Sequence, residues 1–175
     1  ENLLEKIEYV EYKKQNNIEL QNITNNSKNI KENDIFVAVA GNLSDGHKYI
    51  ANAIENGAKT VVYQNNIDFE DGINYIRVSD SRKTLSVISN ILEDYPSEKM
   101  TVIGVTGTNG KTTTATTIYY LMKEIYGSAT NIGTDGTFIG DKRTDNSNTT
   151  PDIYLLNKIF NESLENGIDR VVLEA

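Results

Sequence analysis

Short apolar runs alternate with helical patterns along most of the chain, and this alternation constrains the fold more than any other feature of the sequence. The apolar run at residues 100–105, MTVIGV, predicts a buried strand, and a glycine-rich turn and a helical pattern over residues 111–126 follow it. In the first half, the apolar runs at residues 34–41 and 59–64 flank a helical pattern at residues 47–58. Strands that alternate with helices form βαβ units and mainly parallel sheets. The sequence therefore predicts an α/β fold.

A short segment, PSEK at residues 96–99, is the best candidate for a domain boundary. Pro96 ends the helical pattern before it, because proline breaks a helix interior. We expect a small α/β domain at residues 1–98 and the start of a parallel-sheet domain at residues 99–175. The second sheet has few strands with which to close its core, and Glu174 ends the last of them in the middle of the alternation. We therefore expect the chain to be a truncated piece of a longer protein.

Composition and charge exclude several classes of function. The sequence contains no cysteine, which removes disulfides, thiolate metal sites and cysteine nucleophiles and is compatible with the cytoplasm. The formal net charge of -8 argues against a general nucleic-acid-binding protein, since contacts to a phosphate backbone require a positive surface. No apolar run approaches the roughly 20 residues of a membrane-spanning helix. A phosphorylated small molecule is compatible with this composition, because a few local donors can outweigh the overall charge.

The segment at residues 102–116, VIGVTGTNGKTTTAT, joins a predicted strand to a predicted helix through glycines, threonines and one lysine. Glycines let backbone N–H groups approach phosphate oxygens, and the positive end of the following helix favours an anion. In such a loop Lys111 would reach the β- and γ-phosphates of a nucleotide, and the Thr112 hydroxyl would bind Mg²⁺. The spacing departs from the common G-x-x-x-x-G-K-[ST] pattern, because Val105 stands five residues before Gly110. The alternative interpretation is an ordinary strand–helix turn with an exposed lysine.

The stretch GVTGTNGKTTT at residues 104–114 resembles the ATP-binding loop of the Mur ligases and of their folylpolyglutamate synthetase relatives, which depart from the common spacing in the same way. The resemblance implies a P-loop-type ATPase domain in the second half of the chain, with ATP as a substrate and Mg²⁺ beside it. It also implies which residues contact ATP: Gly107, Thr108, Asn109, Gly110, Lys111, Thr112 and Thr113.

Residues 23–58 resemble the N-terminal domain that binds the uridine nucleotide in MurE- and MurF-type members of this family. The shared features are a serine followed by a basic residue, a strand that ends in glycine, an Asp-Gly-His triplet, and a helix that ends in Gly-Ala. The basic residue here is Lys28, where arginine is more usual. We interpret His47 as a helix-start residue, because a lone histidine without nearby acidic or histidine partners forms neither a metal site nor a triad. The resemblance implies that the uridine diphosphate end of a substrate is held by Ser27, Asn42, Leu43 and Ser44.

Two segments of the second half resemble the MurE type more closely than the MurF type. One is NIGTDGTFIG at residues 131–140, and the other is SNTTPD at residues 147–152. The latter is similar to an Asn-Thr-Thr-Pro stretch that contacts the muramoyl-peptide part of the substrate, which implies this role for Asn148, Thr149 and Thr150. From the residues alone, Thr150 is expected to cap a helix whose first position is Pro151, and both roles can hold at once.

The last strand, RVVLEA, resembles the start of a family segment whose glutamate helps to hold Mg²⁺. The resemblance implies that Glu174 is a metal ligand together with Thr112. The carboxyl end of a strand is also where an α/β fold places ligand-binding groups. The alternative is an exposed residue with no function.

The resemblance as a whole implies an ATP-dependent amide ligase of peptidoglycan synthesis, which adds the third amino acid to UDP-N-acetylmuramoyl-L-alanyl-D-glutamate. The implied partners are this UDP-sugar dipeptide, ATP, and diaminopimelate or lysine, in a cytoplasmic monomer without nucleic-acid or membrane partners. Lys111 and Glu174 would be the catalytic residues, and the domain that binds the amino acid would lie outside this chain. The alternatives are a MurF-type or folylpolyglutamate-type ligase, an unrelated P-loop kinase or NTPase, and a non-catalytic binding module.

Overall fold

The computed structural model divides into two compact units, residues 1–92 and residues 93–175, and each is described by itself. Among the described residues, no helix has both the length and the apolar character that crossing a bilayer requires. The structure describes residues 3–17, 22–41, 45–146 and 148–175.

The first unit is built on a five-stranded sheet with the strand order β1-β5-β4-β3-β2. Strands β2 to β5 are parallel, and β1 pairs with β5 in the antiparallel direction at one edge. The side chains of β3 and β4 are all buried, as expected for parallel strands that are covered on both faces. The strand bounds are β1 (Glu11–Lys13), β2 (Ile23–Thr24), β3 (Ile35–Val37), β4 (Thr60–Tyr63) and β5 (Asn74–Arg77).

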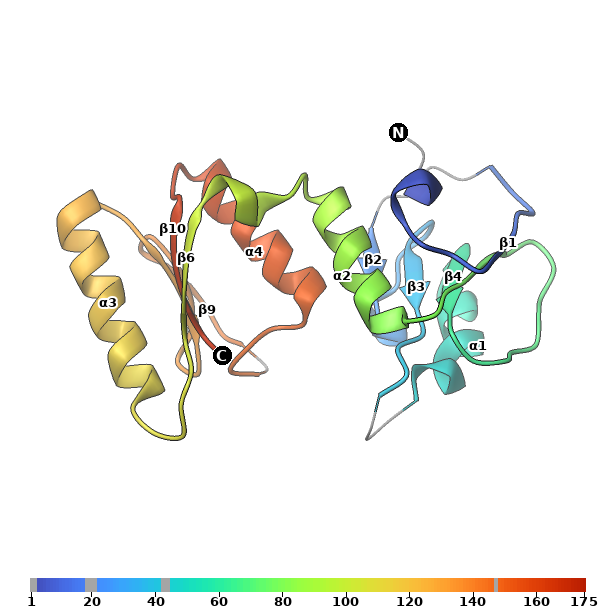
Figure 1. Ribbon diagram of the computed structural model, residues 1–175, viewed down its shortest axis with the longest axis horizontal. Helices are drawn as coiled ribbons and strands as arrows, with labels where there is room; N and C mark the ends of the chain where they lie inside the picture. Colours follow the sequence, from blue (N-terminus) through green and yellow to red (C-terminus); the bar gives the residue numbers. More distant parts are fainter. Residues whose placement is uncertain (1–2, 18–21, 42–44, 147) are drawn as a thin grey trace. The chain divides into compact units, whose positions relative to one another are not determined.

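Two α-helices cover this sheet, α1 (Ile50–Glu55) on one face and α2 (Ser81–Leu92) on the other (Figure 1). Helix α1 buries Ile50 and Ala53 in a core that contains apolar side chains of β3, β4 and β5. The helix predicted at residues 47–58 is therefore shorter than expected, because its first part is a 3-10 turn. The 3-10 helices of this unit are η1 (Leu3–Lys6), η2 (Ser27–Asn29) and η3 (Gly46–Tyr49).

The second unit is built on another five-stranded sheet, with the strand order β6-β10-β7-β8-β9. Strands β6, β10 and β7 are parallel, and β8 and β9 continue the sheet as antiparallel strands. Strand β9 has the polar sequence Lys-Arg-Thr, and all three of its side chains are exposed. The strand bounds are β6 (Thr101–Val105), β7 (Thr130–Gly133), β8 (Gly136–Ile139), β9 (Lys142–Thr144) and β10 (Arg170–Glu174).

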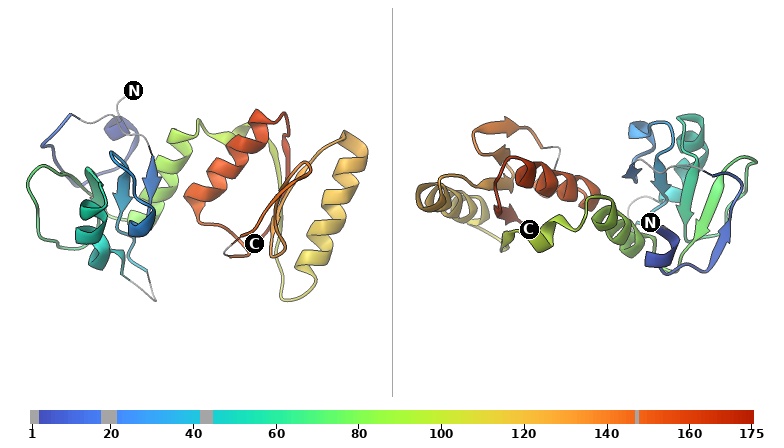
Figure 2. Two further views of the ribbon diagram at one scale, coloured as in Figure 1. Left: turned by 180° about the vertical axis from the view of Figure 1, so that it is seen from behind. Right: turned by 90° about the horizontal axis from the view of Figure 1, so that it is seen from above.

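Helices α3 (Lys111–Tyr126) and α4 (Ile153–Glu165) lie on opposite faces of this second sheet (Figures 1 and 2). Neighbouring residues of β10 point to opposite faces, so that Val172 packs with α3 and Val171 packs with α4. The α/β class predicted from the alternation is confirmed, and both sheets contain parallel strands. The parallel arrangement brings the carboxyl ends of β6, β7 and β10 to one edge of the sheet.

Helix α2 ends before Pro96, the proline that was expected to end it. Helix α2 ends at Leu92, and Asp94 and Tyr95 have positive φ angles of 54° and 52°. Pro96 then begins the short 3-10 helix η4 (Pro96–Lys99). The assignment of a UDP-sugar-binding role to residues 1–98 and an ATP-binding role to residues 99–175 stays a prediction.

Candidate nucleotide and metal site

The glycine-rich loop of the second unit connects the end of β6 to the start of α3. Gly110 is the N-cap residue of α3 and has a φ angle of 77°, a left-handed conformation that suits glycine. Gly110 has no side chain that could cap this helix end, so the first backbone N–H groups of α3 are available to a ligand. The ammonium group of Lys111 donates a hydrogen bond to the carbonyl oxygen of Gly107 at 2.7 Å, which folds the lysine back over the loop. The local geometry is therefore that of an anion-binding helix start.

A cavity of about 340 Å³ opens beside this helix start. Most of the residues that were predicted to contact ATP line it, together with the predicted metal ligand and one of the three predicted sugar-peptide ligands. Gly107 contributes through its bond with Lys111, whereas Asn148 is not among the lining residues. The cavity is lined by Thr108, Asn109, Gly110, Lys111, Thr112, Thr113, Thr134, Thr149 and Glu174.

Glu174 is 1% exposed, so its interpretation as an exposed residue at a strand end is wrong. Its carboxylate accepts hydrogen bonds from the Thr112 hydroxyl at 2.9 Å, the Thr134 amide at 3.2 Å and the Thr134 hydroxyl at 3.3 Å. These donors are neutral, and a buried carboxylate is usually paired with a cation or bound to a metal. The site thus favours a positively charged ligand beside Glu174.

The donor set suits Mg²⁺, which prefers hard oxygen ligands and is commonly held by one or two carboxylates together with phosphate oxygens and water. The carboxylate of Glu174 and the hydroxyl of Thr112 lie 2.9 Å apart and supply two such oxygens. Among the described residues, no three histidine, aspartate or glutamate side chains are grouped as a self-sufficient metal site. A nucleotide would therefore have to supply further oxygen ligands.

Thr150 does not cap a helix, in contrast to the expectation from the sequence. Helix α4 begins at Ile153 with Asp152 as its N-cap, and the Thr150 hydroxyl instead donates to the backbone carbonyl of Glu174 at 2.8 Å. The neighbouring Thr149 hydroxyl lies 3.1 Å from that of Thr134. Two of the three predicted sugar-peptide ligands therefore contact the immediate surroundings of the predicted metal ligand.

Sequence reasoning did not identify Gly133 and Thr134 as site residues, although both contact Glu174. The two residues close the strand β7 and begin the turn to β8. A side-chain atom added at Gly133 would meet the Glu174 Oε1 atom at 2.1 Å. Only the neighbouring positions of β7 and β10 in the sheet reveal this contact, and the sequence gives no direct signal of strand order.

The predicted uridine-nucleotide ligands belong to the first unit. Ser27 is buried at the start of η2, where the Asn26 side chain caps the turn and the Asn56 side chain donates to the Ser27 carbonyl at 2.9 Å. Asn42, Leu43 and Ser44 lie outside the described residues. The uridine-binding role of all four stays a prediction.

His47 is more than a residue at the start of a helix. Its side chain is 8% exposed, and its Nε2 atom accepts hydrogen bonds from the backbone amides of Gln64 at 3.0 Å and Asn65 at 3.1 Å. An accepting Nε2 places the ring proton on Nδ1, which donates to the Asp45 carboxylate. Gly46 between them has no room for a side chain, because a Cβ atom would lie 2.7 Å from the Val39 nitrogen. The Asp-Gly-His triplet therefore links η3 to the ends of β3 and β4.

We expect the Asp45–His47 contact to make the stability of the first unit depend on pH. Hydrogen bonds from the side chain and backbone of His47 lower the pKa of Asp45 below its usual value of 3.8. A lowered carboxyl pKa stabilises the fold above the unfolded-state pKa, and this contribution is lost as the pH falls through the folded-state pKa. Urea unfolding of the chain and of Asp45→Asn from about pH 7 to about pH 2 should show a stability difference that is constant near neutrality and disappears in acid. A stability difference that stays the same at every pH would show that the Asp45–His47 contact does not cause the pH dependence.

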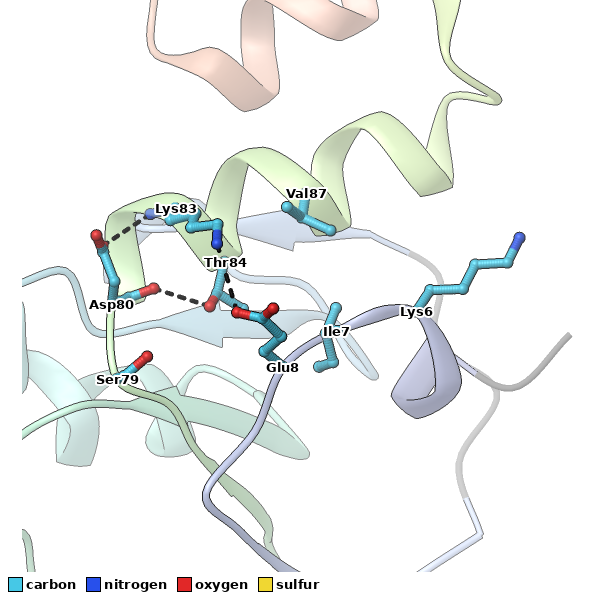
Figure 3. Close-up of a pocket in the computed structure, with 8 residues that line it drawn as sticks. All are labelled: Lys6, Ile7, Glu8, Ser79, Asp80, Lys83, Thr84 and Val87. Carbon is cyan, nitrogen blue, oxygen red and sulfur yellow. Dashed lines mark hydrogen bonds and ion pairs between the residues drawn. The ribbon is translucent and has the colours of Figure 1, made fainter.

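A second hollow, of about 160 Å³, lies in the first unit between the segment after η1 and the start of α2 (Figure 3). Glu8 and Lys83 form an ion pair of 3.4 Å across it, and the Lys83 amide is also bonded to the Asp80 carboxylate at 2.9 Å. Ser27 does not line this hollow, so the predicted uridine ligand and the hollow are separate features.

Comparison with known proteins defines the class to which this fold and site belong. Residues 19–105 match the family model described as "Mur ligase family, catalytic domain", and residues 105–175 match the one described as "Mur ligase middle domain". The chain belongs to the Mur ligase family.

Within this family, the curated relatives are named for two related activities. The UDP-N-acetylmuramoyl-L-alanyl-D-glutamate--2,6-diaminopimelate ligase of Clostridium tetani is 38% identical over 98% of this chain and 36% of the relative. The UDP-N-acetylmuramoyl-L-alanyl-D-glutamate--L-lysine ligase of Staphylococcus aureus is 33% identical over 89% of this chain and 32% of the relative. The chain thus spans about a third of the length of the curated relatives that it matches.

Solved structures of the family share the fold. A UDP-N-acetylmuramoyl-L-alanyl-D-glutamate--2,6-diaminopimelate ligase superposes with a TM-score of 0.73 at 23% identity, over 89% of this chain and 32% of that chain. The MurF ligase from Thermotoga maritima in complex with ADP superposes with a TM-score of 0.56 at 30% identity, over 88% of this chain and 31% of that chain. The α/β architecture is therefore the one found in Mur ligases.

Proposed function

We propose that the protein to which this chain belongs is an ATP-dependent ligase, which adds a third amino acid to UDP-N-acetylmuramoyl-L-alanyl-D-glutamate in peptidoglycan synthesis. The observation that carries the proposal is the cavity in which Lys111, Thr112 and Glu174 meet, in a chain whose relatives are named for this reaction. The added amino acid is diaminopimelate or lysine, because relatives of both kinds match most of the chain. We place the reaction in the cytoplasm, with a monomeric enzyme and without nucleic-acid or membrane partners.

The ATP-binding role falls to the loop and the first turn of α3. The free amides at the start of α3 would bind phosphate oxygens, and the Lys111 ammonium would exchange the Gly107 carbonyl for a phosphate. Glu174 and Thr112 would hold Mg²⁺, which supplies positive charge that offsets the charge of the phosphates during transfer. The ADP complex of the related MurF ligase supports a nucleotide as the ligand.

The reaction proceeds in two steps. A carboxylate oxygen of the UDP-sugar dipeptide attacks the γ-phosphorus of ATP, the bond to the β-phosphate oxygen breaks, and ADP leaves. The amine of the incoming amino acid then attacks the resulting acyl phosphate, and inorganic phosphate and a proton are released as the amide forms. This chain contributes position and positive charge rather than a nucleophile, since phosphoryl transfer depends mainly on alignment and charge stabilisation.

Two sets of residues are assigned to the UDP-sugar dipeptide, one for each end of the molecule. We assign the uridine diphosphate end to Ser27 and to Asn42, Leu43 and Ser44, and the sugar-peptide end to residues 148–150. The contacts of Thr149 and Thr150 beside Glu174 support this, because the attacking carboxylate has to approach the γ-phosphate near the metal.

Calorimetric titration of the chain with the UDP-sugar dipeptide, UDP and ATP tests the proposal. We expect all three to bind. Ser27→Ala should weaken binding of both uridine compounds about 10-fold or more and leave ATP binding unchanged, because one hydrogen bond to a charged group contributes about 1.5–3 kcal/mol. Thr112→Val should weaken ATP binding and leave the binding of both uridine compounds unchanged.

Two outcomes would contradict the proposal. Binding of ATP without any response to the uridine compounds would favour an unrelated P-loop kinase or NTPase. Binding of the uridine compounds without ATP would leave the loop of Lys111 without its proposed role.

A further inference from the structure

The turn between β7 and β8 lies beside the last residue of β10. Strands β7 and β10 are parallel neighbours, and Ile132 pairs with Leu173 in the register of the sheet. The next residue of each strand is Gly133 and Glu174. Gly133 and Gly136 then pair across the antiparallel β7–β8 ladder, which closes a tight turn that contains Thr134. Sheet register alone thus places Thr134 next to the carboxylate of Glu174.

Thr134 contacts both oxygens of this carboxylate. Its amide donates to Oε1 at 3.2 Å, and its hydroxyl donates to Oε2 at 3.3 Å. Thr112 also donates to Oε2, at 2.9 Å. The Thr134 hydroxyl has one proton, so Thr149, whose hydroxyl lies 3.1 Å away, donates to Thr134 in turn. The carboxylate is therefore held on both oxygens by donors from separate elements.

Gly133 supplies the space that this orientation of Glu174 requires. An added Cβ atom would lie 2.1 Å from Oε1 and 2.7 Å from the carboxyl carbon of Glu174. These distances are shorter than any van der Waals contact, so a side chain at residue 133 would force the Glu174 carboxylate out of its present position. The carboxylate thus occupies the space that a side chain at residue 133 would fill.

We propose that Gly133 and Thr134 are positioning residues that fix the Glu174 carboxylate against Thr112, so that a divalent cation bound with a nucleotide meets a preformed pair of oxygen ligands. The inference rests on the proposed function of Glu174 and Thr112 as metal ligands. Thr134 acts through Glu174 and needs no contact with the cation. Groups that orient a metal ligand typically change metal affinity about 10- to 100-fold when they are removed.

Thr134→Val tests the proposal, because valine keeps the β-branched shape and removes only the hydroxyl. The readouts are binding of ADP by calorimetry with and without MnCl₂, and the electron paramagnetic resonance signal of free Mn²⁺. We expect Thr134→Val to weaken Mn²⁺-dependent ADP binding about 10-fold and to affect metal-free ADP binding much less. Thr134→Ser should restore it. The matched control is Thr144→Val, an exposed threonine of β9, which should bind as the unaltered chain does.

A double-mutant cycle with Glu174→Gln separates positioning from a general structural effect. If Thr134 acts through Glu174, Thr134→Val should have no further effect on Mn²⁺-dependent binding once Glu174 is replaced. The same cycle, measured by thermal unfolding without metal, should also show coupling between the two residues. Equal effects of Thr134→Val in both backgrounds would overturn the inference and leave the proposed function intact. If the unaltered chain shows no Mn²⁺-dependent ADP binding, both the inference and the proposed function are overturned.

Discussion

Replacing Lys111 with methionine is expected to lower the kcat of the full-length ligase about 100- to 1,000-fold, as is typical when one preorganised electrostatic contact to a transition state is removed. Lys111 brings a positive charge to the lining of the cavity beside the start of α3. Methionine keeps the unbranched stem and removes the ammonium group. ADP release with all substrates saturating measures kcat, and calorimetry measures the accompanying loss of MgATP affinity.

The control for this experiment is Lys123→Met, on the same helix. Lys123 lies in the last turn of α3 and forms a 2.8 Å ion pair with Asp141, away from the loop. Lys123→Met removes the same charge from the same helix, so kcat should change by less than about 2-fold if the position of the lysine decides the effect on catalysis. A Lys111→Met enzyme that retained most of its kcat would leave the phosphate-binding role of the loop without support.

Much of the second unit could be predicted from the sequence because its central elements carry strong apolar patterns. Helix α3 begins and ends where it was expected, at Lys111 and Tyr126, since a left-handed glycine bounds it at each end. The strand β10 was predicted from its apolar run as well. Strand β9 was not, because its sequence Lys-Arg-Thr is polar and every side chain is exposed. Its pairing with β8 depends on backbone hydrogen bonds, and the hydropathy pattern of the side chains does not reveal these.

The buried face of α3 was only partly predictable. At helical spacing, Ile118, Leu121, Met122 and Ile125 share one apolar face, and helical periodicity would make this the buried face. Leu121 is nevertheless 56% exposed and Ile125 is 68% exposed. The buried side chains are Ala115, Tyr119 and Met122 instead. Tyr119 is buried because its hydroxyl reaches the carbonyl of Gly140 at 2.8 Å, a partner that only the folded sheet supplies. Helical periodicity therefore identified the helix correctly and its core face incompletely.

The candidate site was also predicted only in part. Lys111 and Thr112 are adjacent in the sequence, so a local pattern was sufficient to identify them. Glu174 was identified by resemblance, and its burial and its bond with Thr112 came only from the structure. Thr134 lies in an ordinary turn sequence and gains its role from the order of the strands β7 and β10. Contacts between distant segments were the part that sequence patterns did not predict.

Gly133→Ala is expected to destabilise the second unit. The added methyl group would meet the buried Glu174 carboxylate at 2.1 Å, and overpacking of this kind typically costs about 1–3 kcal/mol. For a unit of this size, such a loss lowers Tm by roughly 5 °C or more. Thermal unfolding followed by circular dichroism measures the change, and Mn²⁺-dependent ADP binding should fall with it, because the carboxylate must turn away from Thr112.

Gly104→Ala provides the matched comparison. Gly104 lies in β6 of the same sheet, and an added Cβ atom would have no neighbour within 4 Å. Its φ angle is not in the left-handed region, so alanine is not strained there, and its Tm should be unchanged or slightly higher because alanine restricts the unfolded chain more than glycine does. The two variants differ in whether a carboxylate stands where the new methyl group would go. Equal Tm values for both would mean that Glu174 has another place to lie, and the space left by Gly133 would then have no part in the site.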